Sequence, residues 1–100
     1  MNVEILYFEG CPHLAAARAI VHEAVSALGR GDVVREIEVT NDEEAIRLRF
    51  LGSPSVRVDG VDVEPAARER TDFAMTCRLY GRDGVVPRDL VRDALRADRA

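Results

Sequence analysis

The sequence predicts an α/β domain whose elements follow the order β-α-β-α-β-β-α, with a four-stranded mixed sheet and three main helices. Two observations predict this class. Two short apolar runs, 3–8 and 33–39, flank a segment of helical periodicity, which predicts a βαβ unit with parallel strands and a right-handed crossover. An Asp-Gly turn then joins two alternating segments, which predicts an antiparallel hairpin. A sheet that holds both kinds of pairing is mixed.

The first strand and the first helix are distinguished by a change in period. Residues 3–8 (VEILYF) are rich in β-branched and aromatic side chains, which favour a buried strand. Over residues 12–28, apolar side chains recur at steps of three and four, which predicts a helix with one apolar face. Pro12 is expected in the first turn of this helix, where no backbone N–H is needed, and Gly29 is expected to end it.

A second strand and a shorter helix are expected next. Residues 33–39 (VVREIEV) predict the strand. The following segment, 40–51 (TNDEEAIRLRFL), begins with residue types that cap helices and places three acidic side chains in its first turn. It also carries apolar residues along one side, so a second helix is predicted there.

The third and fourth strands form the clearest local pattern in the chain. In residues 55–65 (SVRVDGVDVEP), valines alternate with polar residues on both sides of an Asp-Gly pair at 59–60, which is a preferred two-residue hairpin turn. Residues 66–86 are irregular, with an extended stretch expected at 76–80 (TCRLY). The last helix is predicted over residues 87–97 (PRDLVRDALRA), where apolar side chains again have helical spacing.

Length and composition favour one domain over residues 1–100 and argue against several functions. The net charge of −4, with no basic patch evident in the sequence, argues against nucleic acids and anionic membranes as partners. No apolar run approaches the length of a membrane span and no signal peptide pattern occurs, so a cytoplasmic location is expected. No phosphate-binding glycine loop and no zinc-ligand spacing occur, so neither a cofactor nor a resident metal ion is expected.

Two proline motifs lie next to predicted strands. Cys11-Pro12 stands between the first strand and the first helix, and Ser53-Pro54 stands immediately before the third strand. Together with the element order, these motifs resemble the thioredoxin-fold superfamily in its small glutaredoxin-like form, over nearly the whole chain. Residues 48–65 (LRFLGSPSVRVDGVDVEP) also resemble a group of small bacterial thioredoxin-like proteins.

The resemblance implies which residues carry the function. It implies that Cys11 is the nucleophile of thiol–disulfide exchange and that Pro12, Ser53 and Pro54 form the surface that binds the substrate. It also implies a cis Ser53-Pro54 bond that packs against Cys11. The substrate would be a thiol or disulfide of a protein, or a small thiol such as glutathione. Leu14 occupies the place of the second cysteine in a Cys-x-x-Cys site, so the predicted site is a monothiol one.

The residues around Cys11 favour its reactive form. Cysteine reacts as the thiolate. A cysteine at a helix N-terminus faces unpaired N–H groups and the positive end of the helix dipole, both of which favour the anion. The Cys-Pro-His triplet is similar to that of periplasmic disulfide oxidases, and a protonated His13 would add a favourable charge, whereas Glu9 opposes it. We therefore predict a catalytic role for Cys11, assisted by His13.

A mixed disulfide on Cys11 needs a second thiol to resolve it. Three sources are open: glutathione or a similar small thiol, a partner protein, or Cys77. The predicted topology places the connection that contains Cys77 at the same sheet edge as Cys11. Against this role, free cysteine is among the most buried residue types, and the neighbouring Leu79 and Tyr80 favour packing in the core.

Two functions from different classes are consistent with the sequence. The first is thiol–disulfide exchange by Cys11. The second is a non-catalytic binding module, because a fold does not by itself confer catalysis. Such a module would bind a protein partner, or a soft metal ion such as copper(I) or mercury(II) through Cys11 and Cys77.

Overall fold

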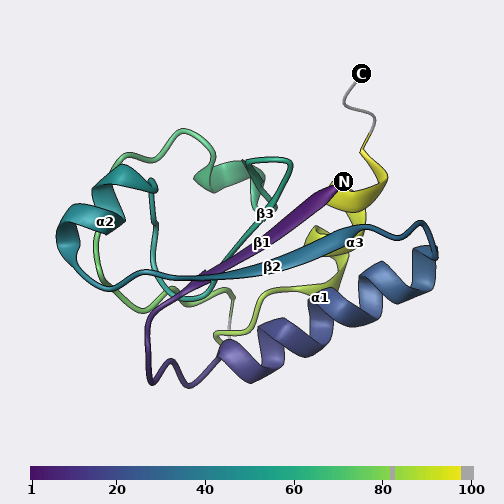
Figure 1. The fold of residues 1–100 in the computed structure, drawn as a ribbon, viewed down its shortest axis with the longest axis horizontal. Coiled ribbons are helices and arrows are strands. Elements are labelled where there is room, and N and C mark those ends of the chain that lie inside the picture. The colour runs from purple at the N-terminus through teal and green to yellow at the C-terminus, as the bar shows by residue number, and fades with distance from the viewer. Residues whose placement is uncertain (82, 98–100) are drawn as a thin grey trace.

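The computed structural model describes residues 1–81 and 83–97 and has the predicted element order (Figure 1). The strands are β1 (Asn2–Tyr7), β2 (Val33–Glu38), β3 (Ser55–Val58) and β4 (Val61–Asp62). The helices are α1 (Leu14–Leu28), α2 (Asp42–Arg47) and α3 (Arg88–Arg96), with a 3₁₀ turn at Pro65–Ala67. The predicted α/β class, with its four-stranded mixed sheet and three helices, is confirmed.

The sheet has the strand order β2-β1-β3-β4. β1 pairs in parallel with β2 and antiparallel with β3, which in turn pairs antiparallel with β4. The arrangement resembles the topology of thioredoxin. Leu6 near the end of β1 lies opposite Ser55 at the start of β3. The loops that follow β1 and precede β3 therefore meet at one edge of the sheet.

Apolar side chains pack on both faces of the sheet. One cluster joins alternate residues of β1 and β3, such as Val3 and Val56, to α1 and α3. The other cluster joins Leu6 to Ala45 of α2 and to Phe50 beyond it. Figure 1 shows α1 running alongside the strands, with α2 and α3 at opposite ends of the view. Because β1 is central and paired on both sides, the loop at its end is attached to a rigid element.

The hairpin between β3 and β4 has the predicted turn. Asp59 and Gly60 both have positive φ, 51° and 81°, which is the backbone that a two-residue turn of this kind requires. The Asp59 carboxylate also accepts a hydrogen bond of 2.8 Å from the backbone N–H of Asn2. The turn is thus joined to the first residue of β1.

The first helix begins later than predicted, at Leu14 instead of residue 12. Two turns precede it: the N–H of Cys11 donates to the carbonyl of Phe8 (3.3 Å), and the N–H of Leu14 donates to the carbonyl of Cys11 (3.4 Å). His13 is the N-cap residue, so Pro12 lies in a turn outside the helix. The prediction of Pro12 in the first helical turn is wrong. The backbone groups of Cys11 and Leu14 that a longer helix would need are bonded in these two turns.

The second helix is shorter than the predicted segment. Its start is as expected, because the side chain of Asn41 accepts a hydrogen bond from the N–H of Glu44, at 2.9 Å. The helix ends at Arg47, and Arg49 adopts a positive φ of 56°, which no helix accommodates.

Within the described ranges, no helix is long and apolar enough to cross a membrane.

Candidate functional site

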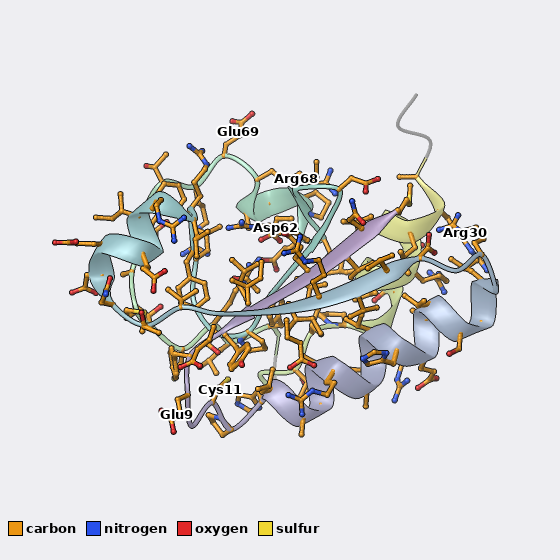
Figure 2. All side chains as sticks on the ribbon, in the orientation of Figure 1. Glu9, Cys11, Arg30, Asp62, Arg68 and Glu69 are labelled. Carbon is orange, nitrogen blue, oxygen red and sulfur yellow. The ribbon has the colours of Figure 1, made fainter. Side chains whose placement is uncertain are left out.

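Cys11 lies in the loop between β1 and α1, at the edge of the sheet, and is half-buried (Figure 2). Its backbone N–H and carbonyl are both used in the two turns that precede α1. Because the helix begins only at Leu14, Cys11 is not the cap residue of the helix as the sequence suggested. One N–H of the first turn, that of Leu14, is directed at the carbonyl of Cys11 itself. The helix dipole therefore acts on this thiol from a greater distance than predicted.

Ser53 and Pro54 are joined by a cis peptide bond, as the resemblance implied. Both residues are buried. The hydroxyl oxygen of Ser53 accepts a hydrogen bond of 3.2 Å from the backbone N–H of Phe8. Since the carbonyl of Phe8 in turn accepts from Cys11, two consecutive hydrogen bonds connect the Cys11 turn to the Ser53-Pro54 turn.

Cys77 lies beside Ser53 and is exposed. The chain around it pairs with Ser53 as an isolated parallel bridge. The N–H of Ser53 donates to the carbonyl of Thr76 (2.8 Å), and the carbonyl of Ser53 accepts from the N–H of Arg78 (2.9 Å). The extended stretch expected at 76–80 is therefore present at its first residues. The interpretation of Cys77 as a buried core residue is wrong.

The close approach of residues 76–78 depends on Gly52. A Cβ atom at this position would lie 3.0 Å from the Cβ of Arg78 and 3.0 Å from the hydroxyl oxygen of Thr76. Its φ of 116° is also outside the range that other residues favour. Glycine at position 52 therefore allows the segment with Cys77 to pack against the turn that precedes β3.

His13 faces a different segment from the one predicted. A Cβ atom at Gly84 would lie 3.0 Å from Nε2 of His13, so the imidazole ring lies against the loop between Tyr80 and α3. Leu79, whose side chain is 68% exposed, approaches the same position of Gly84. Within the described part of the chain, the side chain of His13 makes no hydrogen bond, and its assistance to Cys11 stays a prediction.

A buried ion-pair network lies next to Cys77 and centres on Arg78. Its guanidinium donates two hydrogen bonds to the carboxylate of Asp62, at 2.7 and 2.9 Å, and one each to Ser55 and Glu64, at 3.1 Å. The side chains of Arg78 and Asp62 are 4% and 7% exposed. Burial opposes the charge of Arg78, but the Asp62 carboxylate, the Tyr80 ring and Glu64 together raise the pKa of Arg78 above its ordinary value. The guanidinium of Arg78 therefore stays charged.

Tyr80 joins this network to the cis bond. Its hydroxyl donates to the carbonyl of Pro54 at 2.9 Å, and the guanidinium of Arg78 lies 4.6 Å from the centre of its ring. Burial raises the pKa of Tyr80 well above its usual range, so the hydroxyl remains protonated and able to donate. Arg78 and Tyr80 thereby hold the segment that carries Cys77 against the start of β3.

Sequence reasoning missed the five residues of this network: Ser55, Asp62, Glu64, Arg78 and Tyr80. The alternation of valine with acidic residues in β4 indicates one solvent-facing side, yet Asp62 is only 8% exposed. Arg78 lies 16 positions after Asp62 and is followed by an apolar and an aromatic residue, which is a weak signal for a buried ion pair. The pairing is between segments distant in sequence, so only the fold reveals it.

The arrangement brings Cys11, Ser53, Pro54 and Cys77 to one edge of the sheet, while His13 is directed toward Gly84. The described residues contain no group of three or more His, Cys, Asp or Glu side chains that could hold a metal ion. Comparison of the chain with known proteins found no matching family model, no matching curated protein and no matching solved structure.

Proposed function

We propose that this chain is a thioredoxin-like protein that performs thiol–disulfide exchange, with Cys11 as the nucleophile. The observation that carries the proposal is the position of both cysteines around one turn. Cys11 is connected to Ser53 through Phe8, and Cys77 is flanked by the two residues that bond to Ser53. A second thiol near the first can resolve the mixed disulfide within the same chain.

The first step forms a mixed disulfide. The Cys11 thiolate attacks one sulfur of a substrate disulfide, a new S–S bond forms to Cys11, and the other substrate sulfur leaves as a thiolate. In the second step, the thiolate of Cys77 or of an external thiol attacks a sulfur of the mixed disulfide. If Cys77 attacks at Cys11, a Cys11–Cys77 disulfide forms and the remaining substrate sulfur leaves as a thiolate. The substrate disulfide is then reduced by two electrons, and a small thiol such as glutathione must reduce the protein again.

The backbone of Ser53 is paired with the segment that contains Cys77, and this pairing leaves no backbone group of Ser53 free for a substrate strand. Both backbone groups of Ser53 are already bonded, its N–H to Thr76 and its carbonyl to Arg78. An extended substrate could pair with Ser53 only by displacing residues 76–78. Ser53 and Pro54 are buried, so a substrate reaches the backbone of Ser53 only after that displacement, whereas Pro12 is exposed.

Two single variants and one probe test the proposal. Oxidised glutathione is mixed with Cys77→Ser or with Cys11→Ser, and the rate of glutathione attachment is followed by mass spectrometry. We expect Cys77→Ser to accumulate a mixed disulfide at Cys11 at least about tenfold faster than Cys11→Ser accumulates one at Cys77, because Cys11 is the proposed nucleophile of the exchange. Equal rates in the two variants, at the level of a free cysteine in a peptide, would overturn the proposal and favour the non-catalytic binding module.

A further inference from the structure

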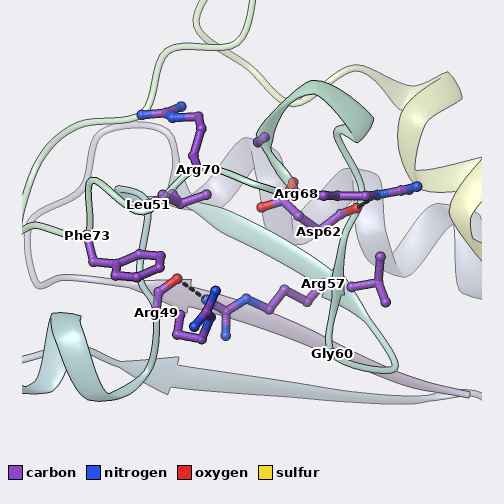
Figure 3. A pocket seen from close by; sticks show the side chains of 10 residues that line it. Arg49, Leu51, Arg57, Gly60, Asp62, Arg68, Arg70 and Phe73 are labelled. Atoms are coloured by element: carbon purple, nitrogen blue, oxygen red, sulfur yellow. Dashed lines mark hydrogen bonds between the residues drawn. The ribbon is translucent and has the colours of Figure 1, made fainter.

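A second concave site lies away from the cysteines, against the β3–β4 hairpin (Figure 3). It has a volume of about 280 Å³ and includes four arginines: Arg49, Arg57, Arg68 and Arg70. These arginines come from three parts of the chain: the segment after α2, strand β3, and the segment after the 3₁₀ turn. Phe73 and Leu51 add apolar surface to the same cavity. Neither Cys11 nor Cys77 is among its lining residues.

The positive charge of this cavity is only partly balanced. Asp62 is the one acidic side chain among the lining residues, and both of its oxygens are bonded to Arg78. Arg70 is paired with Asp72 at 2.6 Å, and Figure 3 shows its side chain directed away from the others. In residues 1–81 and 83–97, the remaining three arginines of the cavity form no ion pair within 4.0 Å.

These three arginines are held in place by neutral groups. Arg57 donates to the backbone carbonyl of Arg49, drawn as a dashed line in Figure 3, and Arg68 donates to the backbone carbonyl of Asp62 at 2.8 Å. The guanidinium of Arg49 lies 5.0 Å from the centre of the Phe73 ring. Carbonyl oxygens and a ring face orient the guanidinium groups, and they leave other N–H donors of each group available.

Arg57 shows that the unbalanced charge has an energetic cost. It is half-buried, and burial, with repulsion from Arg78 and Arg49, lowers the pKa of Arg57. Glu4, directly opposite on β1, opposes this shift but lies beyond ion-pair distance among the described residues. In a chain whose net charge is −4, positive charge gathered in one cavity is a local exception. An anion bound there would offset the cost of desolvating these cations.

We propose that this cavity binds a small molecule through an oxyanion group, either a carboxylate or a phosphate, held by Arg49 and Arg57, whose side chains end close together in Figure 3. The planar guanidinium presents paired N–H donors that match the geometry of both groups. The volume is just below the roughly 300–1,000 Å³ usual for ligand pockets, so the ligand is small. Its non-polar part contacts Phe73 and Leu51.

The test uses inorganic phosphate and citrate as separate probes, titrated into the full chain at low ionic strength and followed by calorimetry. We expect saturable binding of one probe per chain. Arg49→Gln and Arg57→Gln should each weaken that binding at least about tenfold, because each removes charge-assisted hydrogen bonds. Arg35→Gln is the matched control: Arg35 is exposed, lies on β2 outside the cavity, and forms no ion pair among the described residues. Circular dichroism checks that each variant is folded.

The outcomes separate the sources of the anion. Tighter binding of phosphate identifies a phosphorylated ligand, and tighter binding of citrate identifies a carboxylate ligand. The proposal is overturned if neither probe binds saturably, or if Arg35→Gln weakens binding as much as Arg57→Gln does. Because the cavity contains neither cysteine, loss of anion binding leaves glutathione attachment at Cys11 unchanged, and the two proposals fail independently.

Discussion

Cys77 lies beside Ser53, and the two neighbours of Cys77 bond to the backbone N–H and carbonyl of Ser53. Ser53 in turn bonds through its hydroxyl to the strand end that precedes Cys11. A residue before the third strand thus joins two thiols that are 66 positions apart in the chain.

Tyr80→Phe removes the hydrogen bond to the carbonyl of Pro54 and leaves that buried carbonyl without a donor. We expect a loss of about 1–3 kcal/mol in the free energy of unfolding, measured by urea denaturation. Tyr7→Phe is the matched control, since the hydroxyl of Tyr7 forms no hydrogen bond within the described ranges. A loss of equal size in both variants would contradict this role of Tyr80.

Arg78→Met breaks the buried ion pair and leaves the carboxyl group of Asp62 buried without its partner. Breaking such a pair costs about 3–5 kcal/mol, so a large fall in the free energy of unfolding is expected. The double variant Arg78→Met with Asp62→Leu should recover much of that loss, because no buried charge is then left unpaired. If the loss in the double variant equals the sum of the losses in Arg78→Met alone and Asp62→Leu alone, the pair does not act as a unit.

Gly52→Ala introduces a side chain where Arg78 and Thr76 approach to 3.0 Å. We expect a loss of about 2–3 kcal/mol in unfolding free energy, because the substitution adds a steric clash to an unfavourable φ. Gly60→Ala is the control, because Gly60 also has a positive φ but no atom within 4 Å of its Cβ position. It should lose about 1 kcal/mol, the backbone cost alone. Equal losses in Gly52→Ala and Gly60→Ala would show that residues 76–78 move away from position 52 without cost.

Glu36→Gln tests the pH dependence of an ion pair between β2 and α1. Arg18 donates two hydrogen bonds of 2.7 Å to Glu36, and these bonds hold the pKa of Glu36 below its usual range. Such a carboxylate stabilises the fold above its unfolded pKa of about 4.3 and loses this effect as pH falls through the folded value. The variant should be less stable than wild type by about 0.2–1 kcal/mol at neutral pH.

The difference between wild type and Glu36→Gln should disappear as pH is lowered below the folded pKa of Glu36, as followed by urea denaturation at a series of pH values. Glu69→Gln serves as the comparison, because Glu69 is exposed and forms no ion pair among the described residues. Because Glu69→Gln removes no ion pair within the described residues, it should leave the free energy of unfolding at neutral pH close to that of wild type. A Glu36→Gln effect that is constant with pH would contradict the assigned ion pair.

The fold was predictable from the sequence where the signal was local. The Asp59-Gly60 turn and the Asn41 cap each depend on neighbouring residues, and both are present. The start of α1 was placed too early because Pro12 is equally suited to a turn and to a first helical position. The network of Arg78 and Asp62 was not predictable, since charged residues in an alternating strand usually face water.

The candidate site was predictable in part, for a similar reason. The motif and element order placed Cys11 and Pro54 at one edge, and the cis bond followed from the resemblance. The position of Cys77 followed from topology, but its exposure depends on Gly52 and on the bonds of residues 76–78 to Ser53. Such contacts are decided by tertiary packing and leave no periodic pattern.

The central claim is that Cys11, and not the more exposed Cys77, is the reactive nucleophile. The most direct measurement is the first site of reaction in the wild-type chain after brief exposure to limiting oxidised glutathione, determined by peptide mass mapping without reduction. We expect the mixed disulfide with glutathione to appear at Cys11 before any appears at Cys77. If Cys77 carries glutathione while Cys11 remains a free thiol, the more exposed cysteine is the reactive one, which contradicts the assignment of Cys11 as the nucleophile.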